Sequence, residues 1–190
     1  MRRLLDEPWI GRVGAIYCST ERKAIDGADI LAEGLGIGYQ KVEALGENDR
    51  SSTGYLPHAE FVATARRFLR QPDESVRGWE TARHAQARIV RALDDIVARD
   101  EGVGDIAIVF HGGVGTLLYC HLRGAPIRLD LAPGVPHGGA LFCLDAETRA
   151  ILHGWRPIDP DRAEGWEGAE RLWLPSPHLA TDPDGACSKV

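Results

Sequence analysis

"DIAIVFHGGVGTLL" (residues 105–118) joins a short apolar run to a histidine, two glycines and a second apolar run. The first run is rich in β-branched residues, which predicts a buried strand over 105–110. The second run predicts a helix over 112–124 that ends at a glycine. A strand leading directly into a helix is typical of α/β proteins, whose ligands bind beyond the carboxyl ends of the strands. His111 therefore lies where a ligand site is expected.

The rest of the chain alternates strands and helices in the same way. Residues 13–18 predict a strand, and a helix over 19–36 follows it with Ser19 or Thr20 as the N-cap. The remaining predicted elements are a strand at 38–45, helices at 58–70 and 79–100, and a β-hairpin at 139–155 that turns at Asp145–Thr148. This order predicts an α/β fold, a three-layer sandwich in which helices flank a mixed, mainly parallel sheet.

Length and composition indicate one globular domain with a tail. The chain has 190 residues, 44% of them hydrophobic, and a net charge of −6. We expect a domain over 1–156 and a C-terminal tail over 157–190 that is partly disordered, because the tail is rich in Pro, Asp, Gly and Ser. An acidic chain is a poor general nucleic-acid binder, and no run approaches the roughly 20 apolar residues that cross a bilayer. The protein is therefore expected to be cytoplasmic, with no nucleic-acid or membrane partner.

The cysteines do not form a metal or redox motif. None of Cys18, Cys120, Cys143 and Cys187 belongs to a CxxC pair, which argues against a zinc knuckle. The first three lie in apolar runs, which predicts buried, reduced thiols. No other spacing of His, Cys, Asp and Glu is typical of a metal site, so no metal or cofactor is expected.

Polar residues follow three of the predicted strands and would meet at one edge of the sheet. Arg22 and Lys23 follow the first strand, Glu47 the second, and His111 and Gly112 the third. Helix-start amides beside glycines bind anions, and with a cation they suit a phosphate group. The pattern leaves the ordinary alternatives open: a structural histidine, solvated basic residues and a surface carboxylate.

Better-known glycine motifs do not fit this segment. The chain contains neither a GxxxxGK[ST] phosphate loop nor a GxGxxG dinucleotide motif. "HGGVG" is similar to the oxyanion loop of esterases, but the GxSxG nucleophile segment of that fold is missing. The esterase hypothesis is therefore rejected.

Four segments in order resemble the histidine phosphatase superfamily, in its phosphoglycerate-mutase-like branch. They are "IYCSTERKAIDGADILAEGLG", "EALGENDRSSTGYLP", "PDESVRGWETARHAQARIVRAL" and "DIAIVFHGGVGTLL", and the resemblance spans about residues 4–155. It implies a phosphomonoester hydrolase in which one histidine attacks phosphorus and a phosphohistidine is then hydrolysed. A second histidine and cations stabilise the transferring group, and a carboxylic acid protonates the leaving oxygen.

Carried over by position, the resemblance assigns roles to the residues at the predicted sheet edge. It implies that His111 is the second histidine, Glu47 the proton donor and Lys23 the phosphate-binding cation, with Arg22 and Gly112 beside the phosphate. Three positions depart from the usual pattern: Lys23 replaces Arg, Gly27 replaces Thr and Phe110 replaces Ser.

The resemblance names no particular substrate. It implies a small phosphomonoester or phosphate ligand without a cofactor, and it leaves open a homodimer. Candidate substrate-pocket residues are Arg50, Tyr55, His58 and Trp79, each equally compatible with ordinary surface or core.

The family's nucleophile has no counterpart in the sequence. It belongs to an Arg-His-Gly motif that ends the first strand, whereas this chain has no histidine before His58. The chain is therefore expected to lack the first strand and to be impaired as a catalyst. Three explanations remain: an N-terminally shortened enzyme, which we favour; a non-catalytic pseudophosphatase that binds phosphorylated ligands; or another nucleophile such as His137, which no spacing supports.

Overall fold

The computed structural model describes residues 1–133 and 139–159. The strands are β1 (Val13–Cys18), β2 (Gln40–Lys41), β3 (Asp105–Val109), β4 (Ala140–Leu144) and β5 (Ile151–Pro157). The α-helices are α1 (Arg22–Leu35), α2 (His58–Arg70), α3 (Ala82–Arg99) and α4 (Gly112–Leu122). Short 3₁₀ helices lie at Arg2–Asp6, Ile10–Arg12, Glu43–Leu45, Val76–Gly78 and Leu129–Leu131. His137 and most of the predicted tail lie outside the described residues.

Two sheets form the centre of the molecule. The first has the order β2-β1-β3 with all strands parallel, and its register runs from Val13 opposite Asp105 to Cys18 opposite Val109. The second is the antiparallel hairpin β4-β5, which confirms the predicted hairpin. The α/β class and the parallel sheet flanked by helices are thus confirmed, although the described strands form two sheets in place of one mixed sheet.

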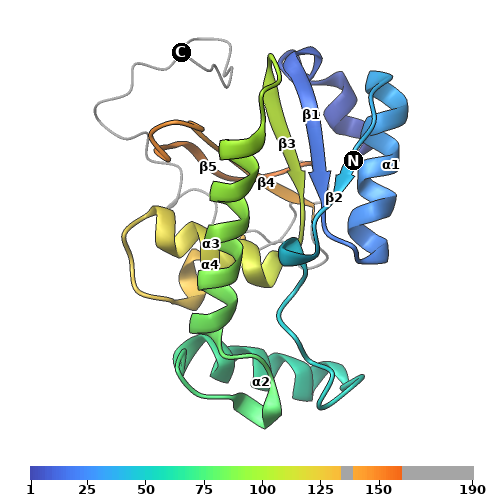
Figure 1. Ribbon diagram of the computed structural model, residues 1–190. Helices are drawn as coiled ribbons and strands as arrows, with labels where there is room; N and C mark the ends of the chain where they lie inside the picture. The colour runs from blue at the N-terminus through green and yellow to red at the C-terminus, as the bar shows by residue number, and fades with distance from the viewer. Residues whose placement is uncertain (134–138, 160–190) are drawn as a thin grey trace.

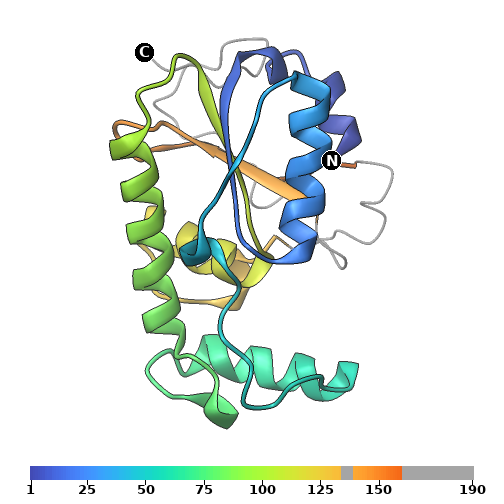
Figure 2. The same ribbon diagram turned by 45° about the vertical axis from the view of Figure 1, so that its right-hand side comes forward.

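Helices cover both faces of the parallel sheet. Figures 1 and 2 show α1 on one side and α3 with α4 on the other. Side chains of β1 alternate between these layers: Tyr17 packs in the cluster that includes α3 and α4, whereas Ile16 and Cys18 pack with α1. The helix α2 lies below the body of the domain in both views. Within the described residues, no helix combines the length and hydrophobicity needed to cross a bilayer.

The strand β3 has the sequence of a central strand but lies at an edge. Its run "DIAIV" is almost wholly apolar, as in strands covered on both faces, yet all five residues are only half-buried. Among the described strands it pairs with β1 alone. The β4-β5 hairpin contributes side chains to both hydrophobic clusters. Phe142 packs against the cluster that includes α3 and α4, and Leu141 packs against the cluster that includes α1. An apolar strand edge of this kind invites further pairing.

Local predictions failed at two places. The strand expected over 38–45 is only Gln40–Lys41, because Arg88 from α3 binds the carbonyls of Ala44 and Gly46 and holds the following turn. The N-cap of α1 is Glu21, and neither Ser19 nor Thr20 takes that place. The Ser19 hydroxyl instead contacts the His111 ring and accepts a hydrogen bond from the Glu21 amide.

The cysteine prediction is confirmed for two residues and wrong for a third. Cys18 and Cys120 are buried, free thiols, and burial raises the pKa of both. Cys143 is disulfide-bonded. Sequence spacing alone could not show this pairing, because a disulfide depends on which cysteines the fold brings together.

Candidate functional site

His111 connects β3 to α4 at the carboxyl edge of the parallel sheet. It is the N-cap of α4, with extended backbone (φ −117°, ψ 155°), and its side chain is 11% exposed. Its Nε2 atom lies 2.7 Å from Ser19 Oγ and 3.4 Å from Glu21 Oε1. Both partners follow β1, the neighbour of β3. The sheet therefore brings the ends of the two strands together, as the sequence predicted for this edge.

Glu47 binds the first turn of α4. Its carboxylate accepts hydrogen bonds from the amides of Gly113 (3.1 Å) and Val114 (2.9 Å). A Cβ atom at Gly113 would lie 2.5 Å from Glu47 Oε1, so a glycine is needed for this close approach. The sequence predicted that these glycines let an anion reach the helix start. In the structure that anion is the carboxylate of Glu47, where it stabilises the positive end of the helix dipole.

We expect Glu47→Ala to lower the free energy of unfolding by about 1–2 kcal/mol, because the amides of α4 lose their acceptor. Urea unfolding measures the change, and Glu43→Ala, in the exposed turn just before, serves as the matched control. Gly113→Ala should cost a similar amount, and the double variant should cost less than the sum. If the stability losses of Glu47→Ala and Gly113→Ala add up in the double variant, the contact between Glu47 and the first turn of α4 is contradicted.

The two predicted cations lie in the first turn of α1 and face solvent. Arg22 forms an ion pair with Asp26 (2.7 Å) and its side chain is 86% exposed. Lys23 is also exposed. Neither forms an ion pair with Glu21 or Glu47 in the part of the chain that the structure describes. Phosphate binding by Arg22, Lys23 and Gly112 stays a prediction.

The predicted pocket residues are divided between core and surface. Trp79 is 2% exposed, and its Nε1 donates a hydrogen bond to Thr53 Oγ1, which favours the core alternative. The Arg50 guanidinium lies over the Trp79 ring, 5.8 Å from its centroid. Tyr55 is 92% exposed, and His58 begins α2 on the surface. Arg50 and Trp79 thus contact each other, and a pocket role for any of the four residues stays a prediction.

Arg88 and Glu80 hold the turn that presents Glu47, and no role was predicted for either residue from the sequence. The Arg88 guanidinium binds the Glu80 carboxylate (2.8 Å) and the carbonyls of Ala44, Gly46 and Glu47. Burial acts to raise the pKa of Glu80, but the hydrogen bonds and charge of Arg88 outweigh it and lower that pKa below its ordinary value. Glu80 also accepts the amide of Asp49, so the pair connects α3 to both sides of Glu47.

Three further site residues were missed: Ser19, Glu21 and Asn48. Asn48 follows Glu47, is 7% exposed, and its Nδ2 has no hydrogen-bond partner in the described structure. A buried donor of this kind is usually satisfied by water or a ligand. Ser19 and Glu21 had a sequence signal, since both are among the polar residues that follow the β1 run, but neither was given a role.

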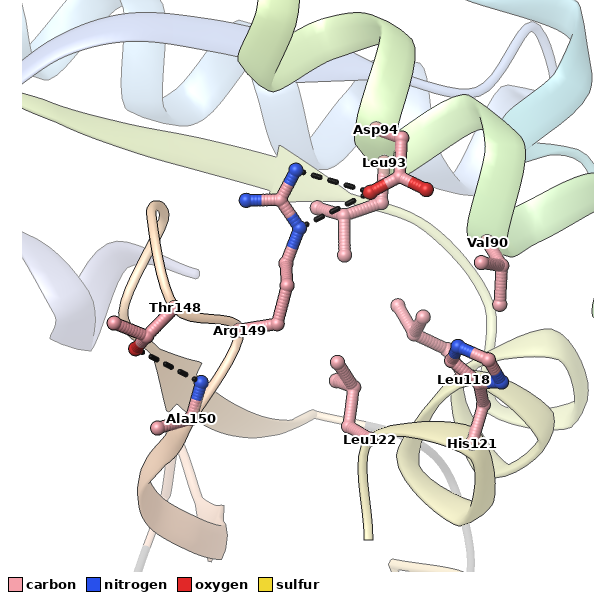
Figure 3. A pocket seen from close by; sticks show the side chains of 9 residues that line it. All are labelled: Val90, Leu93, Asp94, Leu118, His121, Leu122, Thr148, Arg149 and Ala150. Atoms are coloured by element: carbon pink, nitrogen blue, oxygen red, sulfur yellow. Dashed lines mark hydrogen bonds and ion pairs between the residues drawn. The ribbon is translucent and has the colours of Figure 1, made fainter. Parts of the chain in front are cut away.

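A separate cavity of about 360 Å³ lies near the other end of α4 (Figure 3). Its lining residues are Val90, Leu93, Asp94, Leu118, His121, Leu122, Thr148, Arg149 and Ala150. Arg149 is already paired with Asp94 across it (2.9 Å). In residues 1–133 and 139–159, no cluster of three or more His, Cys, Asp or Glu side chains could hold a metal ion. The His111 cluster therefore remains the candidate site.

Comparison with known families agrees with this geometry. The model of the histidine phosphatase superfamily (branch 1) matches residues 5–147. The chain belongs to this superfamily. The match includes β1, Glu47, α3 and the β3–His111–α4 segment, so the site described above lies within the family's domain. No curated protein matches the chain in sequence.

Solved phosphatase structures share the fold. Native mycobacterial glucosyl-3-phosphoglycerate phosphatase is 25% identical with a TM-score of 0.52, over 66% of this chain and 64% of that one. Its complex with inorganic phosphate gives 24% identity, a TM-score of 0.55 and 66% coverage of both chains. Bacillus stearothermophilus YhfR is 21% identical with a TM-score of 0.58, over 79% of this chain and 76% of that one. The chain thus spans just under two thirds of the length of the mycobacterial enzyme.

Proposed function

We propose that the protein is a phosphomonoester hydrolase of the histidine phosphatase type, with the phosphate group bound at His111. The observation that carries the proposal is the joint position of His111 and Glu47 at the start of α4, beside Ser19. Membership of the superfamily and the phosphate-bound mycobacterial relative support a phosphate ligand. The net charge of −6 argues against a general nucleic-acid ligand and is compatible with a small phosphate ester bound at a local site.

The proposed roles follow from the chemistry of the side chains. In the reaction a nucleophilic histidine forms a nitrogen–phosphorus bond while the bond to the leaving oxygen breaks, and water later releases phosphate. His111 donates a hydrogen bond from Nε2 to a phosphate oxygen and so stabilises charge in the transition state. Glu47, when protonated, gives its proton to the leaving oxygen. Its carboxylate lies on the α4 amides, within the same cluster as His111.

The nucleophile is the missing part. In the described structure, the hydrogen bonds and ion pairs of the His111 side chain go to Ser19 and Glu21, and no second histidine is among them. We therefore propose that turnover by the 190-residue chain is impaired. Within residues 1–133 and 139–159, β3 pairs with β1 alone, and its apolar second edge supports the proposal that the family's first strand has no counterpart in this sheet. The alternative is a pseudophosphatase that binds phosphorylated ligands without hydrolysing them.

The proposal is tested by titrating the chain with inorganic phosphate and following by NMR the backbone amides of Gly113 and Val114, in the first turn of α4 beside His111. We expect saturable shifts that His111→Ala abolishes and that His121→Ala, at the other end of α4, leaves unchanged. A titration without saturable change at these amides would overturn the proposed ligand. The codons upstream of Met1 separate the two alternatives: an in-frame strand ending in a histidine favours the enzyme, and a stop codon favours the pseudophosphatase.

A further inference from the structure

The His111 cluster contains an acidic residue that the proposed chemistry does not use. Glu21 is the N-cap of α1, and its Oε1 lies 3.4 Å from His111 Nε2. The same oxygen accepts a 2.6 Å hydrogen bond from the backbone amide of Glu47. Two nitrogens of the site, His111 Nε2 and the Glu47 amide, thus lie close to one carboxylate oxygen.

These two nitrogens, when each carries a hydrogen, are the groups that would bind a phosphate oxygen. Imidazole and backbone N–H groups are typical ligands of phosphate, and a carboxylate oxygen is a smaller anionic acceptor of the same kind. A phosphate at His111 must therefore displace the Glu21 side chain or share the position with it. The residue is able to move, since its side chain is 47% exposed.

The charges around His111 also weaken the binding of a phosphate anion. The cluster around His111 contains two carboxylates, Glu21 and Glu47, while the neighbouring cations Arg22 and Lys23 face solvent. A negative charge within a few ångströms weakens the binding of an anion, and it weakens the binding of a dianion more than that of a monoanion.

We propose that Glu21 is a specificity-determining residue of this site: its carboxylate occupies the position of a phosphate oxygen and lowers the affinity for phosphate dianions. The inference rests on the proposed function, because it assumes that phosphate binds at His111. It also explains why the helix α1 begins with an acidic N-cap that makes no hydrogen bond to its own helix.

The test compares three forms of the full chain: the unchanged chain, Glu21→Gln, and Glu33→Gln as the matched control in the exposed last turn of α1. Glutamine keeps an acceptor oxygen for the Glu47 amide and removes only the charge. Inorganic phosphate is titrated at pH 8, where it is mainly a dianion, and binding is followed at His111. We expect Glu21→Gln to bind about 10-fold more tightly than the other two, a moderate factor because solvent screens a half-exposed carboxylate.

The outcomes separate this inference from the proposed function. Saturable binding with equal affinity in all three proteins would overturn the role of Glu21 and leave the proposed function standing. Weaker binding by Glu21→Gln would also overturn it, because Glu21 would then support the ligand. If none of the three binds phosphate at His111, the proposed function fails and this inference fails with it.

Discussion

Adding a strand upstream of Met1 is expected to raise p-nitrophenyl phosphate hydrolysis by about 10³-fold or more over the 190-residue chain. The added segment is a five-residue run of β-branched residues, as long as β3, followed by Arg-His-Gly and a flexible glycine-serine linker. Paired in parallel with the edge of β3 that no described strand occupies, this run would end beside His111. The chain alone is expected to hydrolyse the ester no faster than His111→Ala does.

The position of Met1 makes this connection feasible. The side chains of Met1 and Val109 both lie against Gly27, 3.4 Å and 3.2 Å from where a Cβ atom of that residue would be. Met1 is therefore close to the last residue of β3. An added parallel strand would end at this same carboxyl end of the sheet. Such a strand would cover side chains of β3 and the hairpin that are now half-buried, which should also stabilise the fold.

Two controls separate docking of the strand from chemistry. Replacing the added histidine by alanine should keep the gain in stability and lose the activity. Placing prolines in the added run should lose both, because proline cannot pair in a sheet interior. Docking of the strand is detected as slower hydrogen exchange at the amides of Ile106 and Ile108. If the strand docks and no phosphohistidine forms, the proposed mechanism is contradicted and the pseudophosphatase is favoured.

Local patterns predicted much of the fold and part of the site. The strand-to-helix joint at His111 was predicted because a strand, a histidine and helix-start glycines are adjacent in sequence. Glu47 was placed at the same edge because carboxyl ends of parallel strands lie together. By contrast, the short β2 depends on Arg88, more than 40 residues along the chain, whose guanidinium takes the carbonyls after it. No local pattern can encode such a contact.

The acidic residue in the site shows a second limit of sequence reasoning. Arg22 and Lys23 were the natural candidates for phosphate ligands because of their charge, yet the helix turns them toward solvent. Glu21, one residue earlier, has extended backbone and points to His111. One residue of helix rotation changes the direction of a side chain by about 100°. Which neighbour reaches the site was therefore decided by the exact start of α1.

Arg88→Met is expected to cause the largest loss of stability among single changes at the site, about 3 kcal/mol. The Glu80 side chain is 9% exposed and that of Arg88 21%, so removing the guanidinium leaves a buried carboxylate without its main partner. The carbonyls of Ala44, Gly46 and Glu47 lose their donor as well. For a chain of this size the midpoint of thermal unfolding should fall by about 10 °C. Arg91→Met, one turn away and exposed, should change stability by less than about 0.5 kcal/mol.

The pH dependence identifies the ion pair as the cause. The pKa of Glu80 is lowered in the folded protein, so its contribution to stability is present above the pKa of an unfolded glutamate, about 4.3. That contribution is lost as pH falls through the lower folded value, because Glu80 then becomes neutral. The stability difference between the unchanged chain and Arg88→Met should therefore be full at pH 7 and shrink below about pH 4. A difference that stays constant down to pH 3 in urea unfolding would assign the loss to the hydrogen bonds that Arg88 donates to the three carbonyls and to packing of its side chain, and not to the ion pair with Glu80.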